Sequence, residues 1–101
     1  MKGSFAQYAQ ESSTEIILYY INGHSETFSL PISPQEFQAM LPQLLQKPWI
    51  TFHLIDQTVC ISTEKVMKIE IKPPINQMQG EGIFANSQRI TALQRNATKF
   101  L

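Results

Sequence analysis

Residues 14–30 have the sequence TEIILYYINGHSETFSL. Residues 15–21 are rich in β-branched and aromatic types, and residues 24–30 alternate between polar and apolar types. Asn22 and Gly23 separate the two runs, and an Asn-Gly pair in this position is a strong signal for a β-hairpin. We therefore predict a hairpin with a two-residue turn at Asn22 and Gly23.

A helix is expected directly after this hairpin. Ser33 and Glu36 have the spacing of a capping box, and Pro34 stands at the first helical position. Pro42 lacks the backbone N–H that would bond to Gln38, so we expect the helix to kink or split near Gln38. The apolar residues that follow the cap at helical spacing are Phe37, Met40, Leu41, Leu44 and Leu45.

Three further strands are expected after the helix. Residues 49–55 and 58–62 have the pattern of a second hairpin around Asp56 and Gln57, and residues 66–72 form a fifth strand that ends at a pair of prolines. The order of elements is ββαβββ. This order predicts an α+β fold, namely a two-layer domain with a mainly antiparallel five-stranded sheet and one kinked helix on one face.

The chain length of 101 residues allows one domain. We expect that domain to cover residues 14–74. Residues 1–13 have no clear period and are interpreted as a mobile leader. Residues 75–101 are interpreted as a loosely structured tail, in which residues 87–99 have the faint apolar spacing of a short helix.

The position of the first turn decides which face of the first strand is internal. A turn at residues 22 and 23 places Ile17 opposite Phe28. It leaves Ile16, Leu18 and Tyr20 on the face away from the helix. The expected core, covered by the apolar stripe of the helix, is Ile17, Tyr19, Phe28, Leu30, Phe52, Leu54, Val59, Ile61, Met67, Ile69 and Ile71.

An apolar row on the outer face of a sheet indicates an interaction surface. Ile16, Leu18 and Tyr20 form this row, and Trp49 extends it. The alternative is that the leader or the tail covers the row. From this row we predict a protein–protein interaction module or small assembly subunit, whose partner is another protein or a second copy of the chain in a homodimer.

A single-stranded nucleic acid is the alternative partner, because cations beside exposed aromatic rings are used to bind such strands. The formal net charge is zero, however, and Glu64 and Glu70 lie among the lysines. This pattern weakens the local positive field. The cations that would contact phosphates are Lys65, Lys68, Lys72, Arg89 and Arg95.

Catalytic chemistry has one candidate pair in the sequence. A turn at Asp56 and Gln57 places His53 opposite Cys60, and a histidine beside a cysteine can activate a thiolate. No third residue that would orient the imidazole is identified, so we predict no enzymatic activity. No ligand spacing indicates a metal, no glycine-rich loop indicates a phosphate cofactor, and we expect neither.

The single cysteine, Cys60, excludes an internal disulfide and suits a reducing compartment. The first residues lack the apolar run of a signal peptide, and no stretch is apolar enough to span a membrane. We therefore expect a cytoplasmic protein that has no membrane partner.

The run from WITFHL at residues 49–54 to VMKIEI at residues 66–71 resembles small uncharacterised bacterial proteins, especially cyanobacterial ones. In these proteins a ββαβββ core ends in a strand with an Ile-Glu-Ile-like ending, here Ile69-Glu70-Ile71. The resemblance covers residues 14–72. It implies the fold, and because its motifs describe packing it implies no functional residue.

Overall fold

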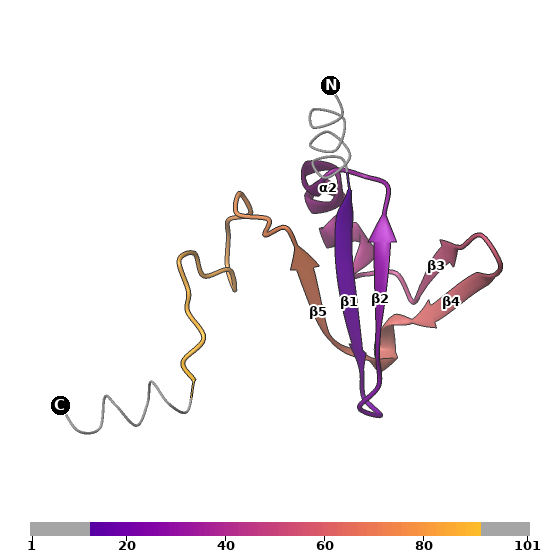
Figure 1. Ribbon diagram of the computed structural model, residues 1–101. Coiled ribbons are helices and arrows are strands. Elements are labelled where there is room, and N and C mark those ends of the chain that lie inside the picture. Colours follow the sequence, from indigo (N-terminus) through magenta and orange to yellow (C-terminus); the bar gives the residue numbers. More distant parts are fainter. Residues whose placement is uncertain (1–12, 92–101) are drawn as a thin grey trace.

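The computed structural model describes residues 13–91 (Figure 1). The α+β class and the order ββαβββ are confirmed in this part of the chain. Residues 1–12 and 92–101, which include most of the predicted leader, much of the predicted terminal helix and Arg95, lie outside it. The elements are β1 (Thr14–Tyr20), β2 (Ser25–Leu30), α2 (Pro34–Leu44), β3 (Trp49–His53), β4 (Thr58–Ser62), the 3₁₀ turn η1 (Thr63–Lys65) and β5 (Val66–Lys72).

The five strands form two antiparallel sheets in place of the single five-stranded sheet that the sequence suggested. One sheet has the order β2-β1-β5, and β3 and β4 form the other as a separate hairpin. Figure 1 shows this hairpin projecting beside β2, on the side of the sheet opposite to β5. The chain therefore returns from the hairpin through η1 to place β5 against β1.

The first hairpin differs from the prediction by one residue. Its observed register places Ile16 opposite Phe28, and the Tyr20 N–H donates to the carbonyl of His24 at 2.9 Å. The loop therefore has three residues and ends at Gly23, whose φ of +90° is a conformation that favours glycine. Three-residue hairpin loops commonly end on such a left-handed residue.

The one-residue difference exchanges the two faces of β1, because successive side chains of a strand point to opposite sides. Ile17 and Tyr19, expected in the core, lie half-buried on the outer face. Ile16 and Leu18 are instead 2% and 0% exposed. The buried apolar core is formed by Ile16, Leu18, Phe28, Phe37, Leu41, Ile50, Phe52 and Ile61.

The second hairpin keeps its predicted faces but not its predicted pairs. The Leu54 N–H donates to the carbonyl of Gln57 at 2.7 Å, so the turn lies at Ile55 and Asp56. Phe52 pairs with Val59 rather than Ile61. This shift moves each partner by two positions and leaves the apolar face intact. Leu54 was expected in the core and is exposed at the end of the hairpin.

The predicted helix cap is confirmed. Ser33 precedes the helix in an extended conformation, and its Oγ accepts a hydrogen bond from the Glu36 N–H at 3.2 Å. The helix continues through Pro42 to Leu44, so it does not split near Gln38. Pro42 lies within the last turn, and its missing N–H removes the one helical bond to the Gln38 carbonyl.

Residues 73–91 contain no helix or strand. Ile75 and Met78 are partly buried against the core, so the packed unit extends a few residues past the predicted boundary at 74. The predicted terminal helix begins in this segment, but residues 87–91 are not helical.

The observed register predicts opposite responses at two neighbouring positions. Leu18→Ala should lower the free energy of unfolding by about 2–5 kcal/mol, because it leaves a cavity in the core. Ile17→Ala should cost less than half as much, because Ile17 is partly exposed on the outer face. Urea denaturation followed by circular dichroism measures both. An equal or larger loss for Ile17→Ala would contradict the register.

Candidate functional site

The predicted contact surface on β1 is wrong. Ile16 and Leu18 face the core, and Tyr20 is half-buried and packs against it. These three side chains cannot form an open binding face. Trp49 is 60% exposed, but it lies on β3, in the separate hairpin. The physical reason is the three-residue loop, which turned the other face of β1 outward.

The outer face of the three-stranded sheet carries a polar cluster around Glu70. The Tyr19 hydroxyl donates to its Oε1 at 2.5 Å, and Lys68 Nζ lies 3.6 Å from its Oε2. Arg89 approaches Oε2 at 3.9 Å, and Lys68 Nζ also lies 4.7 Å from the centre of the Tyr19 ring. Three side chains of the chain thus contact the carboxylate of Glu70 on this side of the sheet.

The hydrogen bond between Tyr19 and Glu70 shifts both titrations. Donation from the hydroxyl, with smaller contributions from Lys68 and Arg89, holds the pKa of Glu70 below its ordinary value of 4.5. The same bond raises the pKa of Tyr19 above 10.0. Because the pKa of Glu70 is lowered by folding, the cluster stabilises the fold above the ordinary glutamate pKa. That contribution is lost as the pH falls through the lowered value.

This cluster weakens the nucleic-acid alternative. Two of the five proposed cations, Lys68 and Arg89, contact a carboxylate, and the strand register places Lys72 opposite Glu15. Lys65 is exposed in η1. The positive charges are therefore interleaved with carboxylates, and they do not form the continuous basic path that a phosphate backbone requires.

The proposed pair of His53 and Cys60 is also not formed. His53 lies opposite Thr58, with 3.1 Å between its Nδ1 and the Thr58 hydroxyl, and Cys60 lies opposite Thr51 at 3.6 Å from sulfur to oxygen. The shifted turn places His53 and Cys60 two positions apart along the ladder, with the pair of Phe52 and Val59 between them. Within residues 13–91 no three His, Cys, Asp or Glu side chains are grouped as metal ligands would be.

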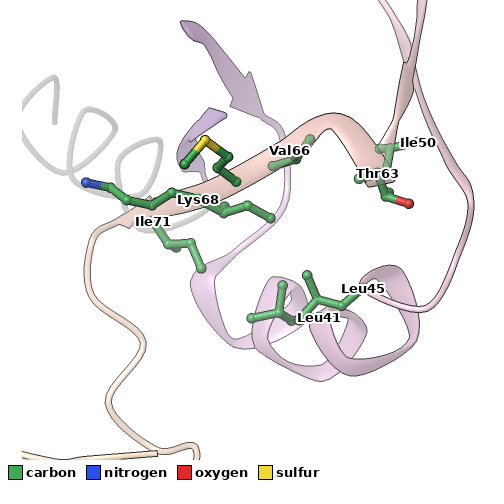
Figure 2. A pocket seen from close by; sticks show the side chains of 9 residues that line it. Leu41, Leu45, Ile50, Thr63, Val66, Lys68 and Ile71 are labelled. Carbon is green, nitrogen blue, oxygen red and sulfur yellow. The ribbon is translucent and has the colours of Figure 1, made fainter. Parts of the chain in front are cut away.

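A groove of about 430 Å³ lies between α2 and β5 (Figure 2). Leu41 and Leu45 project from the helix toward β5, and Ile71 and Val66 lie along the strand above them. The lining is mainly apolar, with a threonine hydroxyl and the stem of a lysine at its border. The full lining is Leu41, Leu45, Ile50, Thr63, Val66, Met67, Lys68, Ile69 and Ile71.

Two features distinguish this groove from an ordinary surface depression. Large apolar side chains border it, since Leu45 is 56% and Met67 is 72% exposed. In addition, β5 is the last strand of its sheet, and no strand of residues 13–91 pairs with its second edge. Tyr19 pairs with Lys68 and Tyr20 with Val66, so Met67 is the extra residue of a bulge in β5, which explains why this expected core residue lies outside.

Sequence reasoning missed this site because strand order is not visible along the chain. The half-buried alternation of residues 66–72 was correctly identified as a strand, but β5 could have been central. The local signal that was available is Leu45, an apolar residue at the end of the helix beside the stripe that Phe37 and Leu41 already fill.

Comparison with known proteins gives no family for this chain. No family model, no curated protein and no solved structure matches it. The resemblance to small bacterial ββαβββ proteins therefore stays a prediction. In the described part of the chain, no helix is long and apolar enough to cross a membrane.

The polar cluster gives a pH prediction. In Tyr19→Phe the pKa of Glu70 should rise toward 4.5, because its strongest hydrogen bond is lost. Tyr20→Phe is the matched control, since the Tyr20 hydroxyl bonds Glu26 instead. NMR titration of the Glu70 carboxyl carbon measures both. An unchanged Glu70 titration in Tyr19→Phe, or an equal shift in Tyr20→Phe, would refute the assignment.

Proposed function

We propose that this protein is a non-enzymatic protein–protein interaction module that binds an extended segment of a partner along the open edge of β5. The observation that carries the proposal is the coincidence of two features at one place. Within residues 13–91, a strand edge that no other strand pairs with lies directly beside an apolar groove bordered by exposed Leu45 and Met67. The backbone of a partner strand would pair with the open edge, and the apolar side chains of that strand would fill the groove.

The physical basis is strand addition. The edge of a sheet presents backbone N–H and C=O groups that can pair with another chain, and pockets beneath the edge then select alternate side chains of the added strand. Ile69 and Ile71 of β5 face the groove, so the added strand would place its own apolar residues next to them. Its remaining side chains would lie on the polar outer face.

The alternatives are less well supported. Binding of single-stranded nucleic acid would use cations that already contact Glu70 or lie near other carboxylates. Thiol chemistry would need His53 beside Cys60, and the strand register separates them. The free, exposed Cys60 suits a reducing environment, so the proposal places the protein in the cytoplasm.

A peptide selection tests the proposed function. Random peptides displayed on phage and selected against the full chain should yield sequences with alternating apolar residues. Leu45→Glu should weaken binding of a selected peptide by about tenfold or more, because a charge replaces apolar area at the groove. Fluorescence anisotropy with the labelled peptide measures the affinity.

Ile55→Glu is the matched control, because Ile55 is a fully exposed apolar residue in the turn between β3 and β4, away from the groove. It should bind the peptide as the unchanged protein does. Failure to select any peptide with alternating apolar residues, or equal binding by Leu45→Glu, would refute the proposal.

A further inference from the structure

We propose that the strand added to β5 is β5 of a second copy of this chain, antiparallel and related by a two-fold axis at Ile69. This inference rests on the proposed function, since it names the partner of the same edge. The result would be a continuous six-stranded sheet with the order β2-β1-β5-β5-β1-β2. Two facts favour this occupant: the direction of the backbone groups along β5 and the sequence of charges on its outer face.

The backbone direction follows from hydrogen bonds at the end of the first hairpin. Tyr20 donates to His24 of the hairpin, whereas Ile21 donates to Lys65 beside β5, both at 2.9 Å. In antiparallel sheets these directions alternate along a strand. Odd-numbered residues of β1 therefore bond β5, and their register partners there are Lys68, Glu70 and Lys72.

The residues between these partners consequently direct their N–H and C=O groups to the open edge. They are Ile69 and Ile71. A two-fold axis at Ile69 makes this residue its own partner, so that each copy donates its N–H to the carbonyl of the other. Such a hydrogen-bonded pair is one of the two pairs that an antiparallel ladder contains, so the symmetry is compatible with normal strand geometry.

The charges favour this register over those with an axis at Lys68 or Glu70. With Ile69 opposite itself, Lys68 of each copy lies opposite Glu70 of the other, and Met67 lies opposite Ile71. Opposite charges therefore meet on the outer face, and apolar side chains meet above the groove. The grooves of the two copies then lie side by side, and the exposed Met67 of each copy packs against the apolar face of β5 in the other copy.

Neighbouring registers are disfavoured by the same criteria. An axis at Lys68 or at Glu70 places like charges directly opposite each other, which destabilises a strand pair. Registers that place Ile69 opposite Lys68 or Glu70 combine the apolar face of one copy with the charged face of the other. The bulge beside Met67 and the proline after Lys72 limit pairing to the short segment between them.

Mixing two charge variants tests the proposal. Lys68→Glu places glutamates at positions 68 and 70, and Glu70→Lys places lysines at the same two positions beside Lys72, so each variant should repel itself and dimerise roughly tenfold more weakly than the unchanged chain. An equimolar mixture should recover dimerisation, because glutamates then lie opposite lysines. Sedimentation equilibrium at low ionic strength, where surface charges are least screened, measures mass relative to the 11.5 kDa of one chain.

The mixture also controls for misfolding. It contains the same two variant proteins that are measured separately, so a misfolded variant could not recover dimerisation in it. Lys47→Glu makes the same charge change outside β5, in the exposed connection before β3, and should dimerise as the unchanged chain does. A chain that is monomeric throughout the concentration range, or a mixture no more dimeric than its components, would overturn the proposal. Peptide binding in a monomeric chain would leave the proposed function standing, whereas loss of both would remove both.

Cysteine cross-linking gives a second readout that does not depend on charge. In a Cys60→Ser background, Ile69→Cys should form an intermolecular disulfide under mild oxidation, because Cα atoms of a hydrogen-bonded antiparallel pair are about 5.5 Å apart. Val59→Cys, which is half-buried on β4, is the control and should remain monomeric. Equal cross-linking at both positions, or none at Ile69→Cys, would refute the two-fold axis.

Discussion

The contact between Phe28 and Phe52 joins the two sheets of this protein. Their rings lie almost parallel, with 4.1 Å between the centroids and 3° between the planes. In the described part of the chain no strand pairing connects the β3–β4 hairpin to the three-stranded sheet. Side-chain packing therefore holds the hairpin against this sheet, and the stack lies at the junction, where burial of both rings excludes water.

The position of the stack makes the core asymmetric. Phe28 belongs to β2, so the hairpin covers the β2 side of the sheet, and α2 contributes Phe37 and Leu41 to the same core. On this face Thr14, Ile16 and Leu18 of β1 and Phe28 of β2 are almost fully buried. Val66, Ile69 and Ile71 of β5 are only half-buried, because the covering elements end before them. The groove beside β5 is thus a consequence of where the aromatic contact lies.

The sequence predicted the elements well and the register poorly, for an identifiable reason. Alternation along a strand shows which residues share a face, but it does not show which residue lies opposite. In the second hairpin this was harmless, because moving the turn to Ile55 and Asp56 shifts the pairs by two positions. In the first hairpin the loop includes Ile21, which shifts the pairs by one. Since β1 is apolar on both faces, its own pattern could not reveal the error.

The same limit explains why the candidate site was not predicted. Whether a strand lies at an edge depends on which strands pair, and strand pairing is a property of the assembled chain. The effect of a charge pattern also depends on whether its strand is central or lies at an edge. In a central strand, the alternation of Lys68, Glu70 and Lys72 only cancels its own field, as the sequence reading assumed. At an edge the same order becomes self-complementary, because an antiparallel copy can place Lys68 of each chain opposite Glu70 of the other. The charges and apolar residues of β5 could therefore be identified from the sequence. Their role at an open edge could be identified only once the strand order was known.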